Sequence, residues 1–196
     1  MNKPLITRAA EGLDRWGWTN AQLQKLVDAG LMDEDAPIEL IKGEIVPMAS
    51  ELNAHFKMRM RLTRRLILVI ETTPPPGPKL IVGTEASVFL FDDTEFKPDV
   101  TIFPEEMDSA RVRGPDLLIA IEVAASSHRR DRIIKPPIYA ESGVRELWVV
   151  DLDREETFVH RDPKGGAYCD ERAFTFDAAL SPLALPNVSI QSSDLG

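Results

Sequence analysis

One stretch of the sequence, Leu117 to Val123, constrains the fold more than any other. It is apolar throughout except for Glu122. Consecutive apolar positions over this length are typical of a strand that is buried on both faces, with other structure packed on each side. A second apolar run, Leu147 to Val150, follows a helical stretch that Ser127 can begin and Ser142-Gly143 ends. The order strand, helix, strand predicts a crossover and a locally parallel pair.

Further elements are predicted upstream of this unit. Thr19 is placed to cap a short helix that ends at Gly30. The segment Ile38 to Val46 predicts a β-hairpin with Gly43 in its turn. The chain therefore opens with a helix and a hairpin.

A long amphipathic helix is predicted from Glu51 to Ile70. Its apolar positions recur at spacings of three and four, and they are Phe56, Met60, Thr63, Ile67 and Ile70. The cluster Pro74-Pro75-Pro76-Gly77-Pro78 must be a connection, because proline fits neither a helix interior nor a central strand. Short strand-prone runs follow it: Leu80 to Val82, Ser87 to Phe91, Val100 to Phe103, Phe158 to His160, Ala167 to Cys169 and Ala173 to Phe176. The predicted fold class is α/β, in an α+β-like arrangement with a central mixed β-sheet flanked by helices.

Length and composition indicate one compact domain. The chain has 196 residues, of which 43% are hydrophobic, enough for one sizeable core. We assign residues 1–17 to an N-terminal extension and residues 18–196 to a single domain. No apolar run approaches the roughly 20 residues of a membrane helix, and the single cysteine, Cys169, fits a reducing compartment. We expect a cytoplasmic protein that does not bind membranes.

The net charge of −9 argues, taken alone, against nucleic acid as a partner, because phosphate binding depends on Lys and Arg. A metal site nevertheless concentrates carboxylates and carries its own positive charge once loaded. The basic residues also form two clusters, Lys57, Arg59, Arg61, Arg64 and Arg65 in one and Arg129, Arg130, Arg132 and Lys135 in the other. These clusters are either phosphate-binding surfaces or solvated helix faces.

A charged residue inside a buried strand is the most informative candidate for a site. Burying the carboxylate of Glu122 is costly unless it is paired or binds a metal. Asp99 begins the strand-prone run after Pro98, so the two acids can converge on one ion if their strands are adjacent. Two carboxylates, with the backbone carbonyl of Val123 and water, suit Mg²⁺. The alternatives are an edge position or a buried salt bridge for Glu122, and a turn or capping role for Asp99.

Lys135 is the third candidate, 13 residues after Glu122 on the predicted helix. Asp131 precedes it by four residues, so the two side chains can pair on one face. On a helix packed over the strand of Glu122, the lysine could stabilise charge in a phosphoryl-transfer transition state or orient the attacking water. Taken alone, a lysine on a helix is more often a surface residue.

The string from Asp116 to Asp151 resembles the signature block of the Uma-type putative restriction endonucleases, a family of the PD-(D/E)xK nuclease superfamily. The matching residues are Glu122-Val123-Ala124, Ser126-Ser127, Asp131, Lys135, Tyr139-Ala140, Gly143-Val144, Glu146 and Trp148-Val149-Val150-Asp151. Upstream, Glu39 to Glu44 resembles the opening block of the family, His55 its helix histidine, and Pro98-Asp99-Val100 its PD motif. The resemblance runs from about Trp18 to the C-terminus.

This resemblance implies a restriction-endonuclease-like core and a site whose roles the residues alone do not give. Asp99 and Glu122 would be ligands of Mg²⁺, for which Mn²⁺ substitutes. Many superfamily members carry a lysine two residues after the second acid, but position 124 of this chain is Ala. The resemblance implies that in this family the lysine has migrated to the following helix, where it matches Lys135. Glu39 would be a further acid near the metal. His55 would lie close by, contacting phosphate or water.

Three further residues complete the predicted site. Arg59, Arg129 and Arg130 are candidates to bind substrate phosphate. For Glu39 the alternative is a solvent-facing residue of the hairpin, and for His55 it is a polar residue on the basic face of its helix.

Pro136-Pro137 follows Lys135 directly, so the helix either breaks or kinks there, or a new helix begins at the prolines.

The leading hypothesis for function is a Mg²⁺-dependent endonuclease that hydrolyses DNA phosphodiester bonds. The second is a nuclease-fold protein that no longer cuts and acts as a nucleic-acid-binding or protein-interaction module. A third, a metal-dependent hydrolase of small phosphoesters, lacks a phosphate loop to support it. We expect a homodimer, because a two-fold pair most simply cuts both strands of a duplex.

Overall fold

The computed structural model describes residues 16–48, 52–107, 112–125, 127–191 and 193. Most of the predicted extension, residues 1–15, therefore lies outside the described residues, as does Ser126 of the family block. The domain boundary predicted at residue 18 is not tested.

A six-stranded mixed sheet forms the centre of the protein, with the strand order β10-β9-β8-β7-β6-β3. The strands are β3 (Leu80–Gly83), β6 (Val100–Pro104), β7 (Ile119–Ala124), β8 (Glu146–Asp151), β9 (Glu156–Lys164) and β10 (Ala167–Thr175). β7 and β8 are parallel, and every other neighbouring pair is antiparallel. The predicted mixed sheet and its parallel pair are confirmed.

A second, four-stranded sheet lies beside the first. Its order is β2-β1-β5-β4, from β1 (Ile38–Ile41), β2 (Glu44–Pro47), β4 (Val88–Phe91) and β5 (Thr94–Phe96). β1 and β2 form the predicted hairpin, and Lys42 and Gly43 both have positive φ in its turn. This backbone twist matches the twist of the flanking strands. A Cβ on Gly43 would lie 2.9 Å from the Cα of Gly17, so glycine is required there.

Three helices and two short helical segments complete the part of the chain that the structure describes. The helices are α1 (Asn20–Asp28), α2 (Asn53–Thr72) and α3 (Lys135–Glu141), and the segments are the 3₁₀ turn η2 (Gly114–Asp116) and the π-helical turn η3 (Arg130–Ile134). Thr19 caps α1 as predicted, and it forms a capping box with Gln22. Among the described residues, no helix has both the length and the apolar character needed to cross a bilayer.

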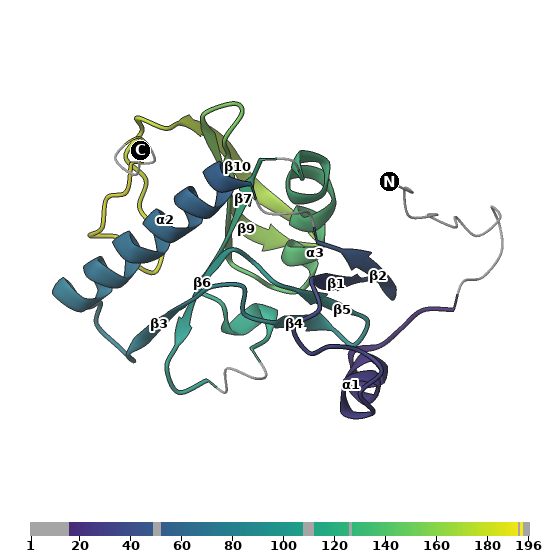
Figure 1. Ribbon diagram of the computed structural model, residues 1–196. Helices are drawn as coiled ribbons and strands as arrows, with labels where there is room; N and C mark the ends of the chain where they lie inside the picture. The colour runs from purple at the N-terminus through teal and green to yellow at the C-terminus, as the bar shows by residue number, and fades with distance from the viewer. Residues whose placement is uncertain (1–15, 49–51, 108–111, 126, 192, 194–196) are drawn as a thin grey trace.

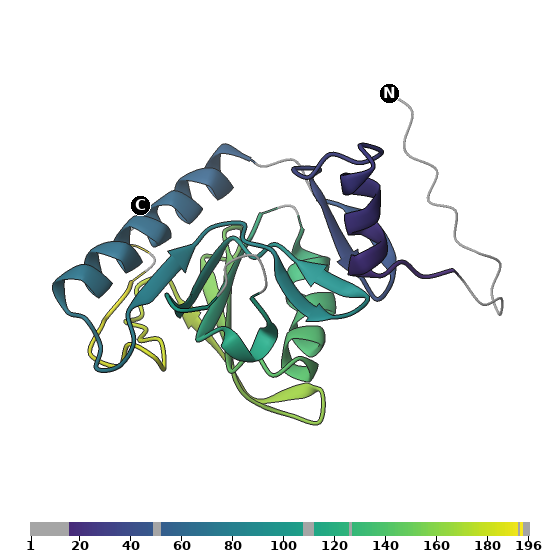
Figure 2. The same ribbon diagram turned by 90° about the horizontal axis from the view of Figure 1, so that it is seen from below.

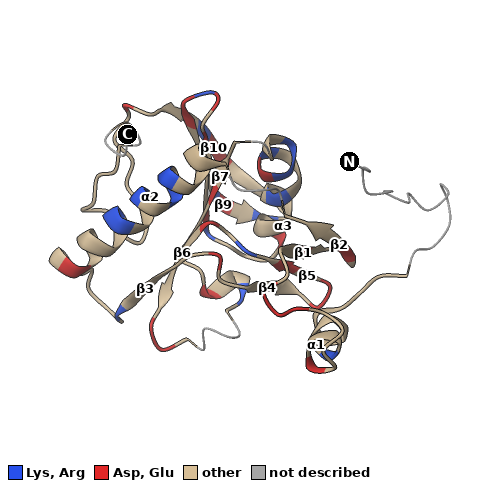
Figure 3. Cartoon of the chain, viewed as in Figure 1, with Lys and Arg blue, Asp and Glu red and all other residues tan. Residues whose placement is uncertain are grey.

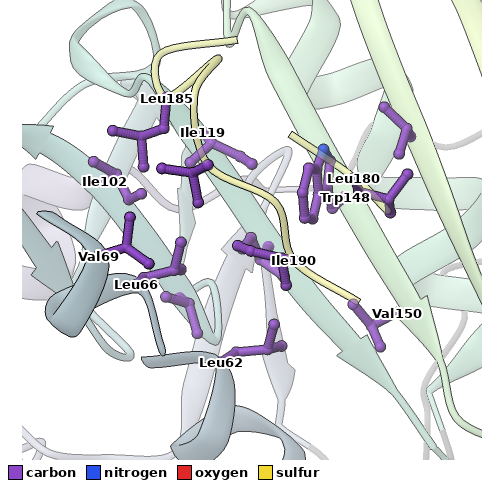
Figure 4. Packing of buried hydrophobic residues seen from close by; sticks show 14 of the residues in the cluster. Leu62, Leu66, Val69, Ile102, Ile119, Trp148, Val150, Leu180, Leu185 and Ile190 are labelled. Atoms are coloured by element: carbon purple, nitrogen blue, oxygen red, sulfur yellow. The ribbon is translucent and has the colours of Figure 1, made fainter. Parts of the chain in front are cut away.

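The six-stranded sheet is the middle of three layers. α2 lies on one face together with the C-terminal segment, while α3 and the four-stranded sheet lie on the other (Figures 1 and 2). Leu62 and Leu66 of α2 pack with Ile119 of β7 and with Ile190 of the tail, as Figure 4 shows. Burial on both faces explains the continuous apolar run in β7.

Alternation along β7 decides which way each side chain points. Ile119, Ile121 and Val123 belong to the core under α2, whereas Ala120 and Ala124 belong to the core under α3. Since successive side chains in a strand face opposite sides, Glu122 points toward α3.

Some sequence predictions were wrong in detail. The buried residues of α2 include Met58, Leu62, Leu66 and Val69, whereas Phe56, Met60 and Ile67 are 39–47% exposed. The helix carries apolar residues on two faces, and spacing alone did not show which one meets the sheet.

Two strand predictions were also wrong. Thr94–Phe96 forms β5, which is absent from the strand-prone runs that the sequence indicated. Ala167–Thr175 is one continuous strand, β10, rather than two short ones. It pairs with β9 along its length, and polar residues such as Asp170 and Arg172 on an exposed edge hid its continuity.

Candidate functional site

β6, which Asp99 directly precedes, and β7, which carries Glu122, are neighbours, and this meets the condition under which the two acids can converge. β6 pairs antiparallel with β7, and Val100 lies opposite Ile121. One step along this register, Asp99 at the start of β6 lies opposite Glu122. Both residues are buried, with 8% and 3% of their surfaces exposed.

Two donors hold the same oxygen of Glu122. Lys135 Nζ lies 2.9 Å from Glu122 Oε1, and the hydroxyl of Tyr139 donates to that oxygen over 2.6 Å. Both donors come from α3, four residues apart, so they lie on one face of the helix. The helix that packs over β7 therefore fixes the orientation of its one carboxylate.

Lys135 is placed at the junction of η3 and α3. Its backbone amide donates to the carbonyl of Arg130, five residues back, as in a π-helix. Pro136 and Pro137 follow in the first turn of α3, where their missing amide hydrogens leave no intrahelical bond unmade. The prolines neither break the helix nor begin a separate one: η3 runs directly into α3, which begins at Lys135.

Asp99 is held by two groups. The backbone amide of Val123 donates to Asp99 Oδ2 over 2.7 Å, and His55 Nε2 of α2 lies 3.2 Å from Asp99 Oδ1. The amide and the carbonyl of a residue in an extended strand face the same side. The carbonyl of Val123 therefore also faces the side of Asp99.

Glu39 reaches the same site from β1. Its Oε1 lies 2.8 Å from Lys135 Nζ and accepts the amide hydrogen of Lys97 over 3.2 Å. Its Oε2 is buried and has no hydrogen-bond partner among the described residues, with Arg130 Nε 3.9 Å away. Only 2% of Glu39 is exposed, so it is not a solvent-facing hairpin residue.

A small pocket of about 60 Å³ joins these groups. Five of the predicted site residues line it, namely Glu39, His55, Asp99, Glu122 and Lys135, and so does Arg130. They come from both sheets and from α2, η3 and α3. The fold thus brings together residues that lie almost 100 positions apart in the sequence.

The electrostatics of the pocket follow from its excess of acids. Burial raises the pKa of Glu122 to about 8; the neighbouring acids Asp131, Asp99 and Glu39 add to this increase, and Lys135 opposes it. Burial alone would lower the pKa of Lys135, but Glu122, Glu39 and Asp131 outweigh it and raise that pKa. The pocket holds more negative charge than its own cations balance, so it favours an additional positive charge.

The predicted phosphate-binding arginines lie in three different settings. Arg59 is buried, and its NH1 lies 2.9 Å from Glu85 Oε2. Arg130 lies at the pocket, and its NH1 donates to the carbonyl of Pro47 over 3.1 Å. Arg129 is exposed. Arg130 is thus the only one of the three that lines the pocket.

Three residues of the site had no assigned role at the sequence level. Tyr139 binds Glu122, Ser127 donates to Asp131 Oδ2, and Lys97 lines the pocket. The spacing of four between Lys135 and Tyr139 was the signal that could have identified the tyrosine. Nothing in the sequence around Lys97 indicated its position.

The donor set is compatible with a hard divalent cation. Among residues 16–48, 52–107, 112–125, 127–191 and 193, no three His, Cys, Asp or Glu side chains are arranged to hold a metal ion. Mg²⁺, however, commonly binds one or two carboxylates and keeps several waters. Asp99, Glu122 and the carbonyl of Val123 offer such a set, and the surplus of buried acids favours a cation.

The fold defines the class of protein. The chain shares its fold with a putative nuclease of DUF820 from Anabaena variabilis ATCC 29413, known from a crystal structure. The TM-score is 0.71 at 18% sequence identity, and the match covers 91% of this chain and 97% of the other. The protein is thus a mixed α/β protein with a nuclease-like fold.

The family follows from the sequence match. Residues 21–193 match Uma2, described as putative restriction endonuclease. The chain therefore belongs to the Uma2 family, and the resemblance found in its motifs is confirmed. No curated protein matches the chain.

Proposed function

We propose that this protein is a Mg²⁺-dependent endonuclease that hydrolyses phosphodiester bonds of DNA. The observation that carries the proposal is the convergence of Asp99, Glu122 and Lys135 in one buried pocket. Membership of the Uma2 family and the nuclease-like fold support it. The metal, the DNA substrate and the residue roles belong to the proposal.

The residues for the metal are Asp99, Glu122 and the carbonyl of Val123, with Mn²⁺ as a substitute for Mg²⁺. A divalent cation there would neutralise charge on the phosphoryl group and lower the pKa of a nearby water. In the overall reaction, a water oxygen bonds to phosphorus and one P–O ester bond breaks. One proton of the water ends on the leaving oxygen and the other is released to solvent, so the new phosphomonoester carries one more negative charge than the diester.

The protein side chains have separate tasks in this scheme. The Lys135 ammonium, fixed by Glu122 and Glu39, places a positive charge at the wall of the pocket, where it stabilises charge that develops on phosphate. His55 orients Asp99 from α2 and lies where it can contact phosphate or water. Arg130, which lines the pocket, is the arginine best placed for phosphate.

A basic surface along α2 supports DNA as the substrate. Lys57, Arg61, Arg64 and Arg65 of this helix are exposed, and Figure 3 marks the Lys and Arg positions along it in blue. Lys57 and Arg61 line a hollow of about 420 Å³ together with Leu152 of the β8–β9 turn. His55 of the pocket lies on the same stretch of helix. A nucleic-acid backbone lying along α2 would meet these cations on its way to the pocket.

The test is plasmid nicking with purified protein in Mg²⁺, in Mn²⁺ and with a chelator. The wild type should nick only with metal, and Asp99→Asn, Glu122→Gln and Lys135→Met should each lower the rate about 100-fold or more. Asp92→Asn, an exposed turn acid, is the matched control and should cut like the wild type. Metal-independent nicking, or full activity in Asp99→Asn, would refute the proposal.

A nuclease-fold protein that does not cut is the second candidate. The specific observation for it is that protein groups already hold both acids: Asp99 by Val123 and His55, and Glu122 by Lys135 and Tyr139. These contacts give both acids protein partners where a metal ion would otherwise bind. DNA binding that survives in Asp99→Asn, with no cleavage by the wild type under any metal, would favour this reading.

We also propose that the protein acts in the cytoplasm as a homodimer, so that two sites face the two strands of a duplex. Light scattering of the purified protein measures the mass directly. A monomer at all concentrations that support cleavage would contradict the dimer.

A further inference from the structure

Three carboxylates from three different elements surround the Lys135 ammonium. Nζ lies 2.8 Å from Glu39 Oε1, 2.9 Å from Glu122 Oε1 and 3.6 Å from Asp131 Oδ1. All four side chains are at most 4% exposed. A set of carboxylate oxygens that converges on one buried point is also the environment that a hard divalent cation takes in proteins.

The set has more binding capacity than Lys135 uses. Glu39 Oε2 is buried, lies at the pocket wall and has no hydrogen-bond partner among the described residues. Asp131 stands farther from the ammonium than a normal hydrogen bond allows. Arg130 adds a second positive charge nearby, with its Nε 3.9 Å from Glu39 Oε2 and 3.7 Å from Asp131 Oδ1, but both distances exceed a normal hydrogen bond. Two positive charges therefore lie among three acids, and only the Lys135 ammonium is in close contact with two of them.

The ammonium cannot easily leave this position. Lys135 is the first residue of α3, held by the π-helical bond to Arg130 and by the prolines that follow. The Phe96 ring lies against it, with its centroid 5.2 Å from Nζ. A cation that entered from solvent would have to displace a charge that the fold itself supplies.

We propose that the Lys135 ammonium occupies the position of a second divalent cation, so that the site takes one metal ion rather than two. The proposal deepens the proposed function and rests on it for the first ion, at Asp99 and Glu122. The lysine supplies a fixed charge where a two-metal nuclease has an exchangeable ion. Removing its side chain should turn the cluster of Glu39, Glu122 and Asp131 into a metal site.

The experiment counts bound Mn²⁺ per chain in metal-stripped protein, from the loss of the signal of free Mn²⁺ in electron paramagnetic resonance. The wild type should bind one ion and Lys135→Ala two. Glu39→Gln in the Lys135→Ala background should return the number to one, because Glu39 serves only the second position. An equal count in Lys135→Ala and the wild type would overturn the inference.

The outcomes separate this inference from the proposed function. A wild type that binds no ion would refute the metal site at Asp99 and Glu122, while a gain of one ion on removing Lys135 would still support the inference. A wild type that binds one ion, with no gain in Lys135→Ala, would leave the proposed function standing and refute the inference.

A second pair of variants covers the case in which Lys135→Ala does not fold without metal. Asp131→Asn removes the most distant of the three negative charges. The double variant Asp131→Asn/Lys135→Ala therefore carries less uncompensated charge than the single variant Lys135→Ala. The double variant should bind one Mn²⁺ ion more than the single variant Asp131→Asn, and Mn²⁺ should raise the Tm of the double variant by more than it raises the Tm of Asp131→Asn. No difference in either measurement would refute the proposal.

Discussion

The buried charge of Lys135 should dominate the stability of the metal-free protein. In Lys135→Met the side chain keeps its approximate volume and loses its charge, which leaves Glu39, Glu122 and Asp131 without the ammonium that lies 2.8–3.6 Å from them. Removing one partner of a buried ion pair costs about 3–5 kcal/mol. For a chain of this size that corresponds to a fall in Tm of roughly 6–20 °C.

The same substitution at Lys42 is the matched control. Lys42 Nζ lies 2.7 Å from Glu141 Oε2, as close as Lys135 lies to its partners, but both side chains of this pair are about half exposed. An exposed pair contributes about 1 kcal/mol or less. The two variants differ mainly in the burial of the lost charge.

The assay is urea unfolding in a chelator, followed by circular dichroism and by the fluorescence of buried Trp148. The decrease in unfolding free energy caused by Lys135→Met should become smaller as the pH falls, because protonation of the unpaired carboxylates relieves their mutual repulsion. If the free energies of unfolding of Lys135→Met and Lys42→Met differ by less than about 1 kcal/mol at pH 7, the reasoning from burial and charge is wrong.

Three further predictions follow from the same contacts. Tyr139→Phe, which removes the 2.6 Å hydrogen bond to Glu122, should weaken Mn²⁺ binding about 10-fold or more, and calorimetric titration that gives the wild-type affinity would contradict it. Because the pKa of Glu122 is raised to about 8 in the folded protein, the metal-free wild type should lose stability as the pH rises from 4.5 to 8. Glu122→Gln should escape this loss, which is on the order of 3 kcal/mol between pH 6 and pH 9; parallel unfolding profiles of the two proteins would refute it. Lys57→Gln with Arg61→Gln should weaken DNA binding and lower the slope of log affinity against log salt by about 2, and an unchanged slope in fluorescence anisotropy would show that these cations do not contact phosphate.

The sequence predicted the central sheet because its signal is local and strong. The run Leu117 to Val123 is apolar enough to require two covered faces, and the helix and strand after it set the parallel pair of β7 and β8. Glu122 was conspicuous for the same reason, as a charge inside this run. The pairing with Asp99 needed only the adjacency of two strands, and the structure provides it.

Other features could not be predicted from local pattern because they depend on tertiary contacts. The apolar residues of α2 fit two helix faces, and only packing against the sheet buried Met58 and Leu62 instead of Phe56 and Met60. The position of Glu39 depends on how the second sheet docks against α3, which no spacing within the chain encodes. For Glu39 only the family resemblance gave any indication.

The two prolines after Lys135 illustrate how a local conflict can become part of a site. Proline at two successive positions removes the amides that an α-helix would use to continue through Lys135. The chain resolves this by a π-helical turn before the prolines, in which the amide of Lys135 bonds to Arg130 and which runs directly into α3. π-helical turns often occur at functional sites, and here the turn sets the lysine between β1 and β7. The local conflict that the two prolines create is therefore part of what places the Lys135 ammonium beside Glu39 and Glu122.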